Sequence, residues 1–138
     1  MLAHTQKALE EFCAAEDLPA DYSTLAKRWF APLAEHIRLR YQSKACRLLV
    51  GVHGAQGTGK TTLCRVLELL LAERGVRAVT LSLDDFYLGR AARQQLAETV
   101  HPLLATRGVP GTHDVGLLEN TLDRLLSGGF CEVPRFDK

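Results

Sequence analysis

The sequence predicts a three-layer α/β/α fold with a parallel β-sheet, preceded by a helical segment. Three observations support this prediction. A continuous apolar run at residues 48–52 has the pattern of a strand buried on both faces. A glycine-rich loop and a stretch of helical periodicity follow this run, and a second β-branched, apolar run occupies residues 76–83. The connection between the two runs is long enough for the right-handed crossover that joins parallel strands.

The segment before the first expected strand has helical periodicity. Its apolar residues recur at helical spacing: Leu9, Phe12, Cys13, Leu25, Trp29, Leu33 and Ile37. We expect a turn at residues 18–22, and a break or kink at Pro32, because proline cannot donate a helical hydrogen bond. Residues 1–46 should therefore form a helical segment packed on a core of residues 47–138, with Trp29 buried in that contact.

Further elements are expected after the glycine-rich loop. Helices are predicted from Lys60 to the stop at Gly75, at residues 90–99, and from an N-cap at Asp114 through Leu126. Residues 101–114 form a loop that contains two prolines and two glycines, and residues 130–133 can begin another strand. The sheet would then hold two strands and the start of a third, and we describe the predicted α/β core as incomplete.

Composition and charge narrow the class of protein. The chain has 138 residues, of which 46% are hydrophobic and 24% charged, values that are ordinary for a globular protein. A formal charge of +1 gives no electrostatic reason to expect nucleic acid or a membrane surface as a partner. The four cysteines lack metal-ligand spacing, and no secretory signal is recognisable. We expect a cytoplasmic protein with reduced thiols, and the sequence leaves its oligomeric state open.

The glycine-rich loop satisfies the pattern G-x-x-x-x-G-K-[ST], the P-loop or Walker A motif. Its residues are Gly54, Ala55, Gln56, Gly57, Thr58, Gly59, Lys60 and Thr61. Glycines allow backbone N–H groups to approach a triphosphate, and the N-terminus of the following helix adds free N–H groups. We expect the motif, with Thr62, to bind ATP, with Lys60 on the β- and γ-phosphates and Thr61 on Mg²⁺. The alternative is a glycine-rich turn before a helix.

Two acids, Asp84 and Asp85, end the second expected strand. Open α/β sheets bind ligands at the carboxyl ends of their strands, so these acids should share an edge with the loop. Asp84 could then deprotonate a substrate hydroxyl that attacks the γ-phosphate, or bind Mg²⁺ directly or through water. The alternative is a solvated turn that caps the next helix.

The stretch Leu81–Leu88 resembles the strand that follows the P-loop in uridine kinases, pantothenate kinases and phosphoribulokinases. Thr106–Asp114 and Val133–Lys138 resemble motifs of the D-glycerate 3-kinase branch of that superfamily. The resemblance implies that Asp84 is the catalytic base and that ATP phosphorylates D-glycerate to 3-phosphoglycerate. It also makes Asp85 a candidate substrate contact.

Glycerate offers one carboxylate and two hydroxyls to the unassigned polar residues. Arg107 or Arg135 could hold the carboxylate in a two-pronged pair, and Tyr87, His113 and Asp114 could bind hydroxyls. Each residue has a structural alternative: a loop-fixing hydrogen bond for Arg107 and His113, an N-cap for Asp114, and a frayed chain end for Arg135.

Kinases of this group continue well beyond 138 residues, with further strands, a second acidic segment and a basic lid. The sequence therefore reads as an N-terminal fragment, and we expect it alone to bind nucleotide weakly and to leave glycerate unphosphorylated.

Three other functions stay open at this point. A pantothenate or uridine kinase fits the same loop and acid. A switch ATPase or GTPase could use residues 79–84 as the strand and acid that hold Mg²⁺, although no guanine-reading Asn-Lys-x-Asp motif occurs. The third is a non-catalytic remnant that binds nucleotide or a partner.

Overall fold

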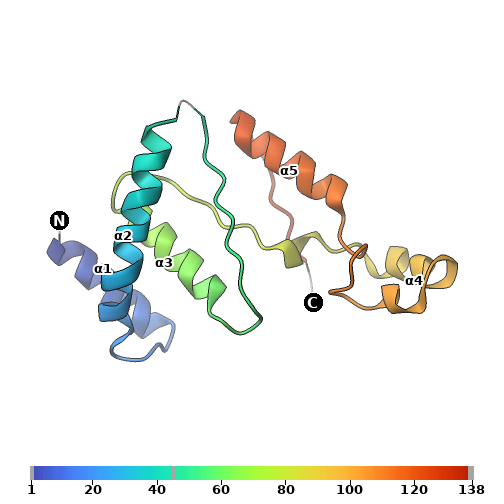
Figure 1. Cartoon of the computed structure of the whole chain (residues 1–138), viewed down its shortest axis with the longest axis horizontal. Helices are drawn as coiled ribbons and strands as arrows, with labels where there is room; N and C mark the ends of the chain where they lie inside the picture. The colour runs from blue at the N-terminus through green and yellow to red at the C-terminus, as the bar shows by residue number, and fades with distance from the viewer. Residues whose placement is uncertain (1, 45, 137–138) are drawn as a thin grey trace. The chain divides into compact units, whose positions relative to one another are not determined.

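The structure is a computed structural model that describes residues 2–44 and 46–136 (Figure 1). The chain divides into two compact units, Met1–Thr80 and Leu81–Lys138, which we describe one at a time. The expected boundary between residues 46 and 47 stays a prediction.

Three helices form the first unit: α1 (Leu2–Ala15), α2 (Tyr22–Gln42) and α3 (Lys60–Ala72) (Figure 1). Each helix packs on the other two around one hydrophobic core. The buried core residues are Leu9, Ala26, Ala34, Val66, Leu67, Leu70 and Leu71. Helix α2 contributes only alanines to this set, and small side chains let helix backbones approach closely. On the apolar faces of α1 and α3 that the periodicity predicted, Leu9 and Leu70 are fully buried, and Phe12 and Leu63 are partly buried against the core.

Helix α2 confirms the predicted core stripe only at Ile37, which is partly buried and packs against the core. Its buried residues are Ser23, Ala26 and Ala34, whereas the Trp29 side chain is 60% exposed and Arg28 lies over its ring at 5.1 Å. The helix turns its small side chains inward, because α1 and α3 already fill the space with leucines. The helix also continues through Pro32, so the expected break does not occur.

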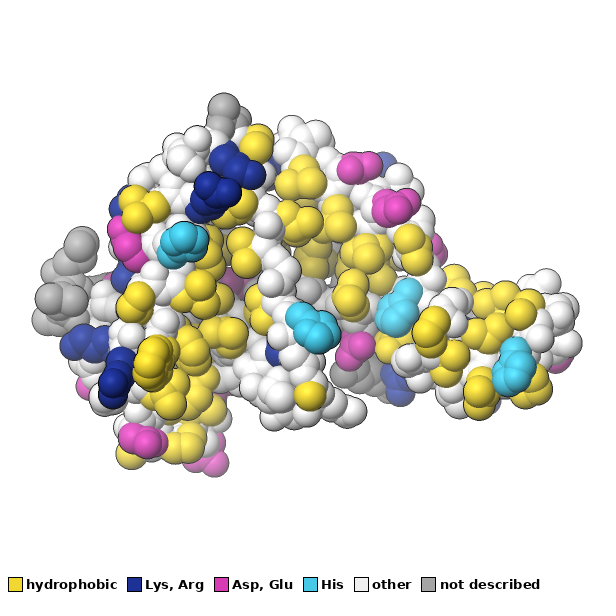
Figure 2. Space-filling model, in the orientation of Figure 1, with side chains coloured by type: hydrophobic (Ala, Val, Ile, Leu, Met, Phe, Trp, Pro, Cys, Tyr) yellow, Lys and Arg dark blue, Asp and Glu magenta, His cyan; other side chains and the backbone are white. Residues whose placement is uncertain are grey.

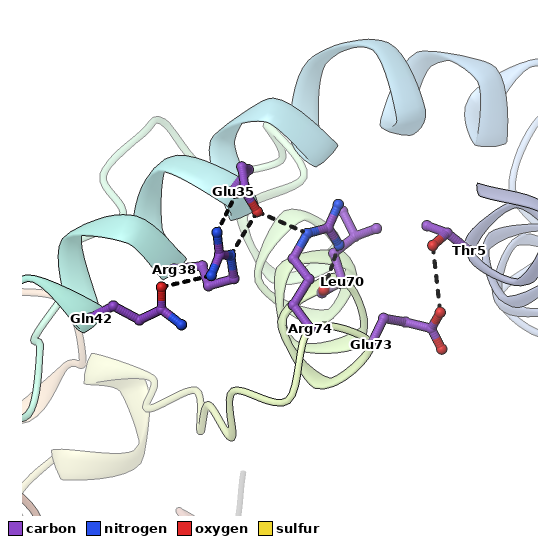
Figure 3. Close-up of polar contacts among 7 residues, drawn as sticks. All are labelled: Thr5, Glu35, Arg38, Gln42, Leu70, Glu73 and Arg74. Atoms are coloured by element: carbon purple, nitrogen blue, oxygen red, sulfur yellow. Dashed lines mark hydrogen bonds and ion pairs between the residues drawn. The ribbon is translucent and has the colours of Figure 1, made fainter. Parts of the chain in front are cut away.

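A polar network joins α2 to α3 outside this core (Figure 3). The Glu35 carboxylate accepts hydrogen bonds from Arg38 Nε at 2.8 Å and Arg38 Nη2 at 2.6 Å, and it lies 3.5 Å from Arg74 Nε. Arg74 Nη1 in turn donates to the Leu70 carbonyl at 2.6 Å. Hydrogen bonding from Arg38, together with the charges of both arginines, lowers the pKa of Glu35. The network therefore fixes the register of α2 on α3.

The second unit contains two 3-10 helices, η1 (Leu83–Phe86) and η2 (Pro102–Ala105), and two α-helices, α4 (Arg90–Thr99) and α5 (Val115–Ser127). Helix α4 packs against η2, and α5 contacts η1. Both α-helices lie where the sequence predicted them, and so does the N-cap: Asp114 Oδ1 accepts from Leu117 N at 2.9 Å. Gly128, with φ of 89°, ends α5 as expected.

The predicted α/β fold is wrong for this structure, because the described residues contain helices but no strand and no sheet. Residues 48–52 and 76–81 form no ladder, and Tyr87–His113 is an isolated antiparallel bridge. Several apolar residues of the two expected strands stay open to solvent, with Leu49 60% exposed, Val50 46% and Val79 61%, although Val76 packs against the core. A parallel strand needs neighbours at its edges and cover on its faces, and the described chain provides neither for these runs. The end of the second run instead becomes η1, where Ser82 Oγ accepts from Asp84 N at 3.2 Å.

Hydrophobic side chains also reach the surface elsewhere, as the face drawn in Figure 2 shows for both units. Along the described chain, none of the helices has the combination of length and apolar character that crossing a lipid bilayer requires.

Candidate functional site

The P-loop keeps the backbone conformation that its glycines permit. Gly57 and Gly59 have φ angles of 77° and 79°, in the left-handed region where a side chain is strained. A Cβ atom at Gly54 would lie 3.0 Å from Thr58 Oγ1, closer than normal packing allows. Each of the three glycines therefore has a steric reason to be glycine. The tip of the loop, from Ala55 to Thr58, is exposed.

One carbonyl organises the loop. The Ala55 carbonyl oxygen accepts from Lys60 Nζ at 2.7 Å and from Thr58 Oγ1 at 2.8 Å. The Thr58 backbone N–H lies 3.4 Å from the same oxygen. Lys60 thus reaches back from the first turn of α3, and its ammonium is held at the loop by this exposed hydrogen bond. An anion that enters the loop would meet this positive charge.

The start of α3 leaves hydrogen-bond donors free. Gly59 is the N-cap and has no side chain to cap with, and the first N–H that bonds to the preceding turn is that of Leu63, to Gly59 O at 2.9 Å. In the described chain, the N–H groups of Lys60, Thr61 and Thr62 donate to no protein atom, nor does the Thr61 hydroxyl. These donors and the Thr61 oxygen fit a polyphosphate and its Mg²⁺, which keeps several waters and needs few protein ligands.

The two predicted acids lie in η1 of the second unit and differ in their surroundings. Asp84 is exposed, and its N–H is capped by Ser82. Asp85 is largely covered, with a side chain that is 13% exposed. Its Oδ2 accepts from Arg135 Nη1 at 2.9 Å and its Oδ1 from Phe136 N at 3.2 Å. Two of the residues predicted to contact substrate, Asp85 and Arg135, therefore pair with each other.

The loop of residues 107–114 lies against the segment that follows η1. Leu88 N donates to the Thr112 carbonyl at 2.9 Å, and Asp114 N donates to the Phe86 carbonyl at 2.7 Å. Phe86 and Thr112, which provide the two carbonyls, are fully buried. This pairing places Tyr87 directly opposite His113 in the isolated bridge.

Tyr87 is the centre of a group of side chains from three distant segments. Its ring stacks on the His113 ring at 4.2 Å and 26° and meets the edge of the Phe136 ring at 5.6 Å and 74°. The Arg107 guanidinium lies over the Phe136 ring, 5.5 Å from its centre. Burial and the neighbouring Asp84 carboxylate raise the pKa of the Tyr87 phenol, and the Arg107 charge partly opposes them. The phenol therefore stays protonated at neutral pH.

The structure thus brings most of the predicted substrate residues together. Their common site, which we call the Tyr87 cluster, consists of Asp84, Asp85, Tyr87, Arg107, His113, Arg135 and Phe136. Asp114 borders it, with its side chain used as the N-cap of α5. Arg107 is exposed and has no acidic partner within the described residues, so it is the cation of the cluster with free donors.

Sequence reasoning missed two residues of this site. Phe136 lies in the motif that ends the chain, and nothing in its type or spacing marks it as a contact of Tyr87. Arg93 is 9% exposed and donates through Nε to the Leu88 carbonyl at 3.0 Å and through Nη1 to the Ala105 carbonyl at 3.1 Å. A lone arginine in an otherwise exposed helix gives no sign of burial in the sequence.

The P-loop and the Tyr87 cluster belong to different units, so Thr61 and Asp84, the two predicted Mg²⁺ ligands, are described separately. No group of three or more metal-binding acids, histidines or cysteines occurs among the residues with assigned positions. Asp137 and Lys138, the last two residues of the C-terminal motif, lie outside the described residues.

Similarity to known proteins is confined to part of the chain. An uncharacterized kinase of Schizosaccharomyces pombe is 42% identical over 94 residues, which are 65% of this chain and 34% of that protein. The chloroplastic D-glycerate 3-kinase of Arabidopsis thaliana is 36% identical over 97 residues, 66% of this chain and 21% of that protein. A pantothenate kinase of Streptococcus pneumoniae is 33% identical over 99 residues, 71% of this chain and 31% of that protein.

The chain therefore spans only 21% to 34% of the length of these three relatives. No protein-family model and no solved structure matches the chain. All three relatives are kinases, and they match a chain that carries a complete P-loop. The chain is thus a distant homologue, over part of its length, of P-loop kinases.

Proposed function

We propose that this chain carries the nucleotide and acceptor sites of an ATP-dependent kinase whose acceptor is D-glycerate. The observation that carries the proposal is the Tyr87 cluster, in which residues predicted to bind substrate contact one another: Asp85 pairs with Arg135, and the Tyr87 ring stacks on that of His113. Partial homology to a D-glycerate 3-kinase of Arabidopsis thaliana points to the same acceptor.

The P-loop binds the nucleotide in this proposal. The free N–H groups at the start of α3 and the Lys60 ammonium receive the β- and γ-phosphates, and the Thr61 hydroxyl receives Mg²⁺. Lys60 donates one of its three ammonium N–H groups to the Ala55 carbonyl at 2.7 Å, which leaves two for the phosphates. Mg²⁺ supplies charge neutralisation between the phosphates, and the chain's own task is to hold and orient them.

The Tyr87 cluster binds the acceptor. Arg107, with its unpaired guanidinium, receives the carboxylate, and Asp84 accepts the proton of the attacking hydroxyl. Of the two arginines considered for the carboxylate, Arg107 suits the role better, because Arg135 already pairs with Asp85 at 2.9 Å. His113 and Tyr87, whose rings stack at 4.2 Å, offer polar groups to the acceptor's hydroxyls.

Binding titrations and product analysis test the proposal together. D-Glycerate, pantothenate and uridine are titrated into the chain with Mg²⁺ and ATP, and ³¹P NMR then looks for 3-phosphoglycerate, which we expect the chain alone not to form. We expect D-glycerate to bind more tightly than the other two. The Arg107→Ala variant should lose about tenfold or more in affinity, the value of a charged hydrogen-bonded pair, and should lose more than Arg135→Ala. The Arg90→Ala variant is the matched control, since Arg90 is exposed and lies outside the cluster.

Tighter binding of pantothenate would favour the second candidate, a pantothenate kinase, which the Streptococcus pneumoniae relative supports. Absence of binding by all three acceptors and by Mg²⁺ with ATP would contradict the kinase proposal itself.

A further inference from the structure

Phe136 makes two contacts with residues of the proposed acceptor site. Its ring meets the edge of Tyr87 at 5.6 Å, and it lies under the Arg107 guanidinium at 5.5 Å. Phe136 is half-buried, whereas Arg107 is exposed. The arginine thus has an aromatic face as its support, and its remaining donors stay available.

An exposed arginine needs such a support if it is to hold a small anion well. Its side chain has several rotatable bonds, and fixing them on binding costs conformational entropy. An aromatic ring beneath the guanidinium restricts it before the ligand arrives, through a cation–π contact, and leaves the edge N–H groups exposed. Arg107 has no carboxylate partner among the described residues that could do this in place of the ring.

Asp85 keeps the ring in position. Its Oδ1 accepts the Phe136 backbone N–H at 3.2 Å, and its Oδ2 accepts Arg135 Nη1 at 2.9 Å. The Asp85 side chain is only 13% exposed, while that of Arg135 is 72% exposed. The covered carboxylate is therefore the fixed end of this contact, and it anchors the backbone of the last described residues to η1.

We propose that Phe136 is a positioning residue for the acceptor site: its ring orients the Arg107 guanidinium toward the acceptor's carboxylate, and Asp85 holds the ring in place. Phe136 and Asp85 then act through Arg107 and need not touch the acceptor. The inference rests on the proposed function, because it assigns Arg107 to the acceptor carboxylate.

Substitutions of the ring separate this role from simple packing. Phe136→Leu keeps an apolar side chain but removes the aromatic face, and Phe136→Tyr keeps the face. Phe130→Leu is the matched control, because Phe130 lies in the same C-terminal segment and is 89% exposed. We expect Phe136→Leu to weaken D-glycerate binding about two- to fivefold, as an exposed cation–π contact predicts. Phe136→Tyr should keep most of the wild-type affinity for D-glycerate, and Phe130→Leu should bind it as the wild type does.

Substitutions of Asp85 test the anchor. Asp85→Asn keeps an oxygen that can accept the Phe136 N–H, whereas Asp85→Ala removes it. Asp85→Ala should lower the affinity for D-glycerate as much as Phe136→Leu does, and Asp85→Asn should lower it less. An equal loss in both would mean that the Asp85 charge acts directly, and would overturn its positioning role.

A second readout needs no acceptor. In the free chain, the ring current of Phe136 should shift the Arg107 Nε–H NMR signal, and this shift should vanish in Phe136→Leu and persist in Phe136→Tyr. Unchanged amide signals of residues 86–88 and 112–114 would show that the fold is kept. If the wild type binds no D-glycerate, the proposed function fails. If it does bind and Phe136→Leu binds equally well, with an unshifted Arg107 signal in every form, the positioning role is overturned.

Discussion

Replacing Arg93 by methionine should loosen the loop that carries Arg107 and His113. Arg93 joins α4 to two backbone segments, through the Leu88 carbonyl at 3.0 Å and the Ala105 carbonyl at 3.1 Å. Leu88 also donates its N–H to the Thr112 carbonyl at 2.9 Å. The arginine therefore joins the segment that follows Tyr87 to the segment that precedes Arg107, and methionine keeps much of its apolar stem while removing every donor.

The two hydrogen bonds differ in what their loss costs. Ala105 is exposed, so water can replace the lost donor, and the net cost is about 0.5–1.5 kcal/mol. Leu88 is half-buried, so its carbonyl loses a donor that water replaces less well, at about 1–3 kcal/mol. Relief of the buried charge offsets part of this sum. We expect the second unit to lose about 2 kcal/mol of opening free energy, which is roughly a 30-fold increase in amide exchange.

Hydrogen exchange followed by NMR measures this effect locally. The informative amides are those of Leu104 and Thr106, which bond within η2 to His101 O at 2.9 Å and Leu103 O at 3.1 Å. Arg90→Met in the same helix is the control, and the amide of Leu70 in α3 reports on the first unit. Exchange at Leu104 and Thr106 that stays within threefold of the wild type, or an equal effect of Arg90→Met, would refute the reasoning.

Three further predictions concern the first unit. Lys60→Ala should weaken binding of Mg²⁺ and ATP at least about tenfold in a calorimetric titration, the value of a charged hydrogen bond, whereas Lys27→Ala, at an exposed lysine of α2, should not. Leu70→Ala should lower the free energy of unfolding of the first unit by about 2–5 kcal/mol in urea, because the Leu70 side chain is fully buried. Hydrogen bonding from Arg38 lowers the pKa of Glu35 below its ordinary 4.5, so its stabilising effect is present above about pH 4.5 and is lost as the pH falls through the folded-state pKa. Glu35→Gln should therefore flatten the fall in urea midpoint between neutral pH and about pH 3, and an unchanged slope would contradict this.

The helices could be predicted from the sequence because the information that specifies them is local. Apolar spacing, the Asp114 cap and glycine stops define α3, α4 and α5 without reference to distant residues. The P-loop could be identified for the same reason, since its residue types and spacing directly reflect phosphate chemistry.

The sheet could not be predicted correctly, because a strand depends on partners that its own sequence does not specify. The runs at 48–52 and 76–83 have the composition of buried strands, yet Leu49 and Val79 are mostly exposed and no ladder forms in the described chain. The prediction of which face of α2 is buried failed for the same reason, because it too depends on distant partners. Trp29 looked like a core residue by size, whereas packing against α1 and α3 selected Ala26 and Ala34.

The Tyr87 cluster was predicted only in part. Family-like motifs marked Tyr87, Arg107 and His113, but their mutual contacts depend on long-range pairing between residues 86–88 and 112–114. Asp85 and Arg135 form an ion pair, although nothing in the sequence indicated that these two candidate substrate contacts would bind each other. Such neutralisation cannot be read from residues fifty positions apart.

Mapping of amide shifts by two-dimensional NMR tests the central claim most directly. Mg²⁺ and ATP are added first to the labelled chain and D-glycerate second. The account predicts that the nucleotide shifts the amides of residues 54–62, and that D-glycerate then shifts Arg107 and His113. Nucleotide shifts that spare residues 54–62, or glycerate shifts that spare the Tyr87 cluster, would contradict it.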